Sequence, residues 1–265
     1  MPCAIMYHMA KPAFAATIKL KTVLLAAAAL LTLAALCVAV YFTGAYAVSG
    51  TSRRIPIYSV EREDKHISIT FDCAWGADYT GEILAALKGY NVPATFFMVQ
   101  FWAEKYPEYV RAISEGGHDI GTHSKTHSYM SRMAEGDIMQ ELASSSAAIT
   151  KITGKSVELF RAPYGDYDNE LIDTAAQLGL YTIQWDVDSL DWKDLSAGEI
   201  SMRVISRVKS GSIILMHNNG AHTAEAVPVI LCELIARGYT FVPVSELIYR
   251  QNYYIDSNGR QQPAA

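Results

Sequence analysis

Cysteine and basic charge are both scarce in this chain of 265 residues. Its four cysteines are Cys3, Cys37, Cys73 and Cys232, and the first two lie before or within an apolar segment near the N-terminus. No disulfide framework is therefore predicted. The net charge is −5, and no block of basic residues occurs in the body of the chain. This charge pattern argues against nucleic acid as a partner.

The longest uncharged stretch lies at residues 22–42 (TVLLAAAALLTLAALCVAVYF) and is long enough to span a bilayer. Lys11, Lys19 and Lys21 precede it, which predicts that residues 1–21 are cytoplasmic and that all later residues lie outside the membrane. We favour a retained anchor over a cleaved signal peptide, although residues 45–47 match an A-x-A cleavage site. A buried helix of a soluble protein is the third possibility.

After the apolar segment, a polar linker is expected over residues 43–65, within which residues 55–60 could pair as a short strand. A flexible polar tail is expected over residues 249–265. Between them, over residues 66–248, strand-like and helix-like patterns alternate, and glycines follow several of the helical patterns. Strands are predicted at 66–71, 94–99, 119–121, 159–160, 181–185, 212–216 and 239–244. Helices are predicted at 79–88, 103–115, 135–153, 169–178, 198–208 and 224–237. This alternation predicts an α/β fold in which a parallel sheet forms a distorted (β/α)7–8 barrel.

The stretch His123-Ser124-Lys125-Thr126-His127 places two imidazoles four positions apart. On a single helical turn both rings would lie on one face, where they could bind one metal ion. Zinc held in this way keeps a position open for water and lowers the pKa of that water to roughly 7. Ser124 excludes the protease motif H-E-x-x-H, so the general base must come from elsewhere. The alternative is that two of the seven histidines fall on a solvated turn by chance.

Further polar residues directly follow the predicted strands. Because the carboxyl ends of parallel barrel strands share one face, these side chains are expected to meet there. They are Asp72, His123, His127, Arg161, Asp188, Asp191 and His217.

With these residues in place, the sequence resembles the polysaccharide deacetylases, the NodB-like family of carbohydrate esterases. The resemblance covers residues 65–248, and five blocks occur in the family's order. They are Thr70-Phe71-Asp72-Cys73, His123-Ser124-Lys125-Thr126-His127, Arg161-Ala162-Pro163-Tyr164-Gly165, Asp188-Ser189-Leu190-Asp191-Trp192 and Leu215-Met216-His217.

The resemblance implies a metal-dependent de-N-acetylase in which each block has a role. Asp72 would be the general base, His217 the general acid, and His123 and His127 the metal ligands. Arg161 would orient Asp72, and the acidic residues Asp188 and Asp191 would support His217 and Arg161. Trp192 and Leu215 would form the wall of the acetyl pocket, and the Tyr164 N–H would help to bind the oxyanion. These roles meet the needs of amide hydrolysis, which requires an activated water, oxyanion stabilisation and a proton for the leaving amine.

Cys73 departs from the family pattern, which usually has a second Asp at this position completing a metal triad with the two histidines. Three alternatives remain open. A Cys73 thiolate could be the third zinc ligand, because zinc accepts sulfur readily. The two histidines and additional waters could hold the metal more weakly. Alternatively, metal binding is lost and the domain is a carbohydrate-binding relic.

We interpret the sequence as that of a membrane-anchored, outward-facing hydrolase. It is expected to use a divalent metal, with zinc favoured, and to remove N-acetyl groups from amino sugars of a cell-wall polymer, with peptidoglycan favoured. The alternative is a weakly active or inactive protein that binds glycans in the same groove. Both Asp72 and His217 are present, which argues against this alternative because binding alone needs neither a base nor an acid.

Overall fold

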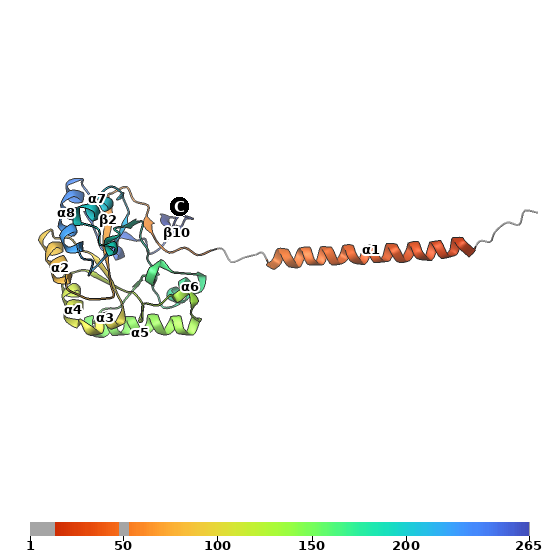
Figure 1. Cartoon of the computed structure of the whole chain (residues 1–265), viewed down its shortest axis with the longest axis horizontal. Helices are drawn as coiled ribbons and strands as arrows, with labels where there is room; N and C mark the ends of the chain where they lie inside the picture. Colours follow the sequence, from red (N-terminus) through yellow and green to blue (C-terminus); the bar gives the residue numbers. More distant parts are fainter. Residues whose placement is uncertain (1–13, 48–52, 265) are drawn as a thin grey trace, which may run out of the picture. The chain divides into compact units, whose positions relative to one another are not determined.

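A computed structural model describes residues 14–47 and 53–264 of the chain, and the chain divides after Ser52 into two compact units. In the first unit, α1 (Phe14–Ala47) is a continuous helix (Figure 1). Its segment Leu20–Tyr41 is long and apolar enough to cross a membrane, and none of this segment is buried.

The second unit is built around a curled parallel sheet whose strand order is β6-β5-β4-β3-β2-β8-β7, with β9 paired to the start of β2. The edge strands β6 and β7 do not pair with each other, so the barrel stays open, and the predicted distorted barrel is confirmed. β2 is buried along almost all of its length, as expected for a parallel strand covered on both faces. The strands are β2 (His66–Cys73), β3 (Thr95–Met98), β4 (Asp119–Thr122), β5 (Leu159–Phe160), β6 (Tyr181–Thr182), β7 (Val187–Asp188), β8 (Ile213–His217) and β9 (Thr240–Phe241).

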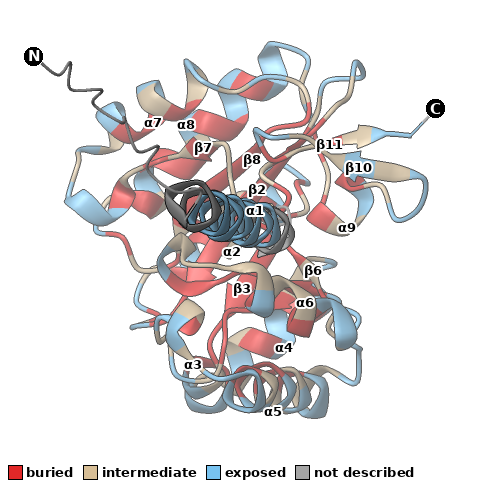
Figure 2. Ribbon diagram, turned by 90° about the vertical axis from the view of Figure 1, so that its right-hand side faces the viewer, coloured by how far each residue is buried: buried red, intermediate tan, exposed pale blue. Residues whose placement is uncertain are grey.

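Helices cover the outer face of the sheet, and the main apolar core lies between the two layers. In Figure 2 the strands β2 and β8 are buried, whereas the helices are buried on one side and exposed on the other. The helices are α2 (Thr80–Gly89), α3 (Gln100–Lys105), α4 (Pro107–Glu115), α5 (Glu135–Thr153), α6 (Asn169–Gln177), α7 (Ala197–Ile205), α8 (Thr223–Ala236) and α9 (Val244–Leu247). Short 3-10 turns are η1 (Met130–Arg132), η2 (Pro163–Gly165) and η3 (Asp191–Lys193).

One predicted helix and one predicted strand differ from the elements in the structure. The single helix predicted over 103–115 is divided into α3 and α4, because Pro107 has no backbone N–H and begins a new helix. The strand predicted over 181–185 ends at Thr182 as β6, and β7, which was not predicted, follows at residues 187–188 and lies at the opposite edge of the sheet.

The start of the second unit is part of the barrel, although residues 43–65 were predicted to be a linker with no more than a short strand at residues 55–60. Ile57 forms a parallel bridge with Ile183, and Ser59 forms an antiparallel bridge with Ser212. This segment therefore crosses the opening between the β6 and β8 regions of the sheet. Ile57 and Val60 are buried in a second apolar cluster together with Phe97 and Val244.

Residues 249–265, predicted to be a flexible tail, instead contain β10 (Tyr253–Ile255) and β11 (Arg260–Pro263). β11 pairs in parallel with β1 (Ser59–Val60) and antiparallel with β10. Gln261 is fully buried there, and its side chain exchanges hydrogen bonds with the backbone of Tyr249. A polar core residue of this kind leaves no apolar pattern in the sequence, which explains the difference.

Candidate active site

A cavity of about 790 Å3 opens at the carboxyl ends of the strands. Of the predicted site residues, all but Arg161 and Cys73 line it. The lining members are Asp72, His123, His127, Tyr164, Asp188, Asp191, Trp192, Leu215 and His217. In the sheet register Asp72 lies beside His217, and Leu215 lies beside Asp188. Parallel pairing of short strands therefore brings residues from distant blocks to one edge.

Arg161 is completely buried behind Asp72. Its Nη1 donates to Asp72 Oδ1 at 2.8 Å and to Thr70 Oγ1 at 2.8 Å, and its Nη2 donates to the Gln184 carbonyl at 3.1 Å. Its guanidinium also lies over the ring of Phe97, 4.1 Å from the centroid. Burial alone would raise the pKa of Asp72, but Arg161, with lesser contributions from His123 and His217, outweighs burial and lowers it. Asp72 is therefore held as an oriented carboxylate.

The two histidines lie in a loop, so the prediction of a single helical turn is wrong. Ser124 and His127 have positive φ angles of 75° and 58°, which are incompatible with a right-handed helix. The imidazole rings still approach to 4.9 Å between centroids.

Glu141 of α5 holds this histidine loop (residues 123–127) in place through hydrogen bonds. Its Oε2 accepts hydrogen bonds from the backbone N–H groups of Lys125 and Thr126, and its Oε1 accepts from Thr126 Oγ1. Sequence analysis missed this residue. A signal existed, because Glu141 occupies the apolar face of the helix with Ile138, Leu142 and Ser145.

Both imidazoles have environments that favour the neutral ring that a metal requires. Burial lowers the pKa of His123. For His127, burial and then the neighbouring His123 lower the pKa to about 4. His123 Nδ1 lies 2.8 Å from the Arg161 carbonyl, which fixes a proton on Nδ1 and leaves Nε2 free, 3.5 Å from Asp72 Oδ2. The buried Nδ1 of His127 has no hydrogen-bond partner among the described residues. The pair therefore fits a divalent metal as two nitrogen ligands.

Cys73 lies on the opposite side of β2 from Asp72, since neighbouring strand residues alternate between faces. It is fully buried within the main apolar core, and its Sγ contacts the Phe71 carbonyl at 3.9 Å. Burial, together with the charge of Asp72, raises the pKa of its thiol well above the usual value. Within residues 20–41 and 53–264, no group of three or more His, Cys, Asp or Glu side chains is arranged around a common metal position.

His217 is held by Asp191, three residues beyond Asp188. Asp191 is completely buried; its Oδ1 lies 2.7 Å from His217 Nδ1, and its Oδ2 accepts from the His217 N–H and from Thr223 Oγ1. Burial alone would lower the pKa of His217, but the hydrogen bond and charge of Asp191, with the charges of Asp72 and Asp188, raise it above the usual value. Asp188 itself accepts a hydrogen bond from the Leu190 N–H.

The remaining predicted residues form the walls of the cavity. Leu215 of β8 is nearly buried, whereas Tyr164 and Trp192 are 54% and 56% exposed. Tyr164 lies in η2 with a φ of 61°. A non-glycine residue in this conformation is strained, and such strain is concentrated at functional sites.

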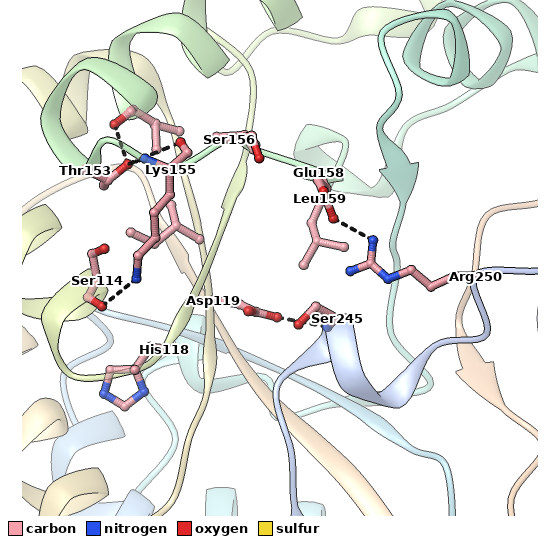
Figure 3. Close-up of a pocket in the computed structure, with 14 residues that line it drawn as sticks. Ser114, His118, Asp119, Thr153, Lys155, Ser156, Glu158, Leu159, Ser245 and Arg250 are labelled. Carbon is pink, nitrogen blue, oxygen red and sulfur yellow. Dashed lines mark hydrogen bonds and ion pairs between the residues drawn. The ribbon is translucent and has the colours of Figure 1, made fainter.

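A second cavity of about 370 Å3 lies where β4 and β5 begin, at the opposite ends of the strands (Figure 3). Its charged groups are already paired. Lys155 Nζ donates to the Ser114 carbonyl, Arg250 forms an ion pair with Glu158, and Asp119 accepts from the Ser245 N–H. The candidate active site is therefore the cavity at the carboxyl ends of the strands, which contains the predicted site residues.

Comparison with known proteins gives an independent view of the chain. Residues 59–183 match the family of polysaccharide deacetylases. A peptidoglycan-N-acetylglucosamine deacetylase of Bacillus cereus is 34% identical over 72% of this chain and 92% of its own length. The uncharacterized protein YlxY of Bacillus subtilis is 31% identical, and PgdA of Listeria monocytogenes, a peptidoglycan-N-acetylglucosamine deacetylase, is 32% identical. This chain spans 60% of the length of YlxY and 42% of the length of PgdA.

Solved structures of the same fold include that of a protein described as a pseudoenzyme. The wild-type protein BA3943 from Bacillus anthracis, a pseudoenzyme of carbohydrate esterase family 4, aligns with a TM-score of 0.70 at 31% identity, covering 72% of this chain and 68% of that chain. A BA3943 mutant with restored enzymatic activity aligns equally well, at 32% identity over 72% of this chain and 70% of that one. Because the identity extends over nearly all of one curated relative, and the five sequence blocks surround one cavity, the chain belongs to the polysaccharide deacetylase family.

Proposed function

We propose that this chain hydrolyses the N-acetyl groups of amino sugars in a cell-wall glycan, with peptidoglycan as the preferred polymer. The observation that carries the proposal is that one cavity contains a carboxylate with a lowered pKa and an imidazole with a raised pKa. The pKa of Asp72 is lowered by Arg161, and the pKa of His217 is raised by Asp191. Two groups whose environments move their pKa values apart are the mark of a base and an acid. Relatives named as peptidoglycan deacetylases support the choice of polymer.

The reaction follows from these protonation states. Asp72 accepts a proton from water as the new oxygen–carbon bond forms at the acetyl carbonyl. Because Nδ1 of His217 faces Asp191, its other nitrogen, Nε2, holds the proton that is delivered to the amide nitrogen as the carbon–nitrogen bond breaks. Acetate and a free amine result. The cycle closes when Asp72 loses its proton and His217 regains one.

His123 and His127 are the proposed metal ligands, and the Tyr164 N–H is the proposed oxyanion donor. A divalent metal held by the imidazoles, for which zinc is favoured, supplies a Lewis acid and lowers the pKa of water. We leave Cys73 out of the ligand set because its Sγ packs in the apolar core. Trp192 and Leu215 are proposed to enclose the acetyl methyl group.

Release of acetate from purified peptidoglycan by the full chain in detergent tests the proposal. Activity should require added divalent metal and should be lost with a chelator. His217→Ala should lower the rate constant by roughly 10²–10⁴-fold, the usual scale for a positioned acid. Wild-type rates in that variant would remove His217 from the mechanism.

A glycan-binding protein without catalysis is the second candidate. The placement of Cys73 in the core, which leaves two imidazoles as ligands, and the similarity to a pseudoenzyme favour it. Retention on insoluble peptidoglycan, with no acetate released under any metal, would establish it.

A further inference from the structure

The segment that crosses the opening of the barrel is fastened on both sides. It comprises residues 53–60 and is called the strap below. The Ile57 N–H donates to the Thr182 carbonyl at the end of β6, at 3.0 Å. The Val60 N–H donates to the Gly211 carbonyl just before β8, at 2.9 Å. The strap therefore bridges two regions of the sheet that are far apart in the sequence.

The strap also contacts the residue whose carbonyl holds Arg161. The Gln184 N–H donates to the Ile57 carbonyl at 2.7 Å, and the Gln184 carbonyl accepts from Arg161 Nη2 at 3.1 Å. Gln184 is only 1% exposed, so water cannot readily replace either bond. A chain of hydrogen bonds therefore runs from the strap through Gln184 to Arg161, and from Arg161 to Asp72.

Apolar packing joins the strap to Arg161 a second time. The guanidinium lies over the rings of Phe97 and Trp185, 4.1 Å and 5.5 Å from their centroids. Trp185 directly follows Gln184 in the chain. Phe97 belongs to the same buried apolar cluster as Ile57. A displacement of the strap would therefore alter both the hydrogen-bond acceptor and the ring contacts that fix the guanidinium.

The loop that follows Arg161 is tied to the strap as well. The hydroxyl oxygens of Tyr58 and Tyr167 lie 3.4 Å apart. The Arg54 N–H donates to Asn169 Oδ1 at the start of α6, at 2.7 Å. The strap thus contacts the backbone on both sides of the barrel opening and the loop between β5 and α6.

We propose that the strap is a positioning segment of the active site, which holds Gln184 and thereby fixes Arg161 and the orientation of Asp72. The inference rests on the proposed function and adds to it a segment that lies outside the five sequence blocks. Arg161 binds Asp72 through Oδ1, which leaves Oδ2 to accept the proton. Orientation matters for such a base, because a misplacement of about 1 Å can cost about 100-fold in rate.

Ile57→Ala tests the proposal, with Ile230→Ala as the matched control. Both changes remove the same atoms from a buried apolar position, but Ile230 lies on α8 in the main core. The assay measures acetate release from soluble peptidoglycan fragments by the full chain in detergent. Ile57→Ala should lower kcat by about 10–100-fold with little change in KM, because the base moves whereas the glycan contacts remain. Ile57→Val should restore kcat, and Ile230→Ala should keep it.

Gly211→Ala is a second test, which creates no cavity. A Cβ at Gly211 would lie 1.7 Å from the Val60 carbonyl oxygen, so the contact between Gly211 and the strap could not persist. Gly117 has the same φ of 79°, and a Cβ there would meet nothing within 4 Å. Gly117→Ala therefore reproduces the backbone strain without the clash. We expect kcat to fall by about tenfold in Gly211→Ala and to stay near the unaltered value in Gly117→Ala.

A measurement that needs no catalysis separates failure of this inference from failure of the proposed function. Isotope-edited NMR of the arginine-labelled full chain reports on the guanidinium of Arg161, which exchanges slowly with water because it is buried. Its signals should shift and exchange faster in the two strap variants, Ile57→Ala and Gly211→Ala, and stay unchanged in the two controls. This outcome supports the strap even if no protein releases acetate. Unchanged Arg161 signals in both strap variants, or kcat values equal to those of the controls, would overturn the inference.

Discussion

Asp72 and Arg161 depend on each other more than an exposed catalytic pair would. Asp72 is only 6% exposed and Arg161 is completely buried, so the carboxylate that we propose as the base also neutralises a cation inside the protein. Removing one partner of a buried pair leaves an uncompensated charge, which is strongly destabilising.

Asp72→Asn should therefore show two effects. The rate constant for acetate release should fall by roughly 10²–10⁴-fold, and the free energy of unfolding should fall by about 3–5 kcal/mol. Chemical denaturation measures the second effect. Asp173→Asn, which breaks an exposed ion pair with Arg54, is the control and should change stability by less than about 1 kcal/mol. Unchanged stability in Asp72→Asn would contradict the described pairing.

The pKa of His217 is expected to set the alkaline limit of activity. Its imidazolium must carry the proton, so activity is present below its raised pKa and is lost as the pH rises through it. Asp191→Asn removes the main group that raises this pKa, so the alkaline limb of the kcat profile should move to lower pH. Asp194→Asn removes a carboxylate that lines the cavity without bonding His217 and should move the limb much less. An unmoved limb in Asp191→Asn would exclude His217 as the titrating acid.

A substitution at Cys73 distinguishes a metal site with two histidine ligands from a site in which the Cys73 thiolate is the third ligand. Because its thiol packs in the core, Cys73→Ser should leave zinc affinity almost unchanged, whereas His123→Ala should abolish measurable binding. Titration calorimetry of the purified chain measures both. A drop of more than about tenfold in Cys73→Ser would instead support a thiolate ligand, since serine is a poor ligand near neutral pH.

At the level of elements, α5 reaches the site through one side chain. Glu141 accepts from two backbone N–H groups of the histidine loop, and its replacement removes the charge that holds them. Glu141→Gln should weaken zinc binding by about 10–100-fold, the scale for groups that orient metal ligands. Helix content should stay constant by circular dichroism. Asp137→Asn, an exposed change on the same helix, should have no effect, and equal affinity in both variants would contradict a positioning role for Glu141.

Elements with strong local patterns could be predicted from the sequence, whereas those fixed by tertiary contacts could not. α5 and β5 have the bounds that periodicity and glycine placement predict. The histidine loop differs because Glu141, eighteen and fourteen positions away from the two histidines, stabilises a left-handed backbone that no local pattern encodes. Likewise Asp188 and Asp191 both follow a predicted strand, so the sequence does not show which of them contacts His217. The packing of η3 against β8 brings Asp191 to His217.

At the scale of the whole molecule, the apolar segment of α1 leads us to expect that the chain is held in a membrane. The full chain should fractionate with membranes and be released by detergent, whereas a chain beginning at Arg53 should remain in the soluble fraction. The lysines before the apolar segment predict that protease added outside the cell digests the second unit. Intact full-length chain in the cytosol would contradict the anchor, and a mature form beginning at Val48 would indicate signal cleavage.

The pairing of β1 with β11 also determines when folding can finish. Ser59 and Val60 receive their strand partners from Arg260 and Gln261, about two hundred positions later in the chain. Contacts between such distant residues form late, because a long loop must close first. The rim of the barrel therefore stays incomplete until Arg260 and Gln261 have been synthesised, so that a chain shortened before them would leave Ser59 and Val60 without these strand partners.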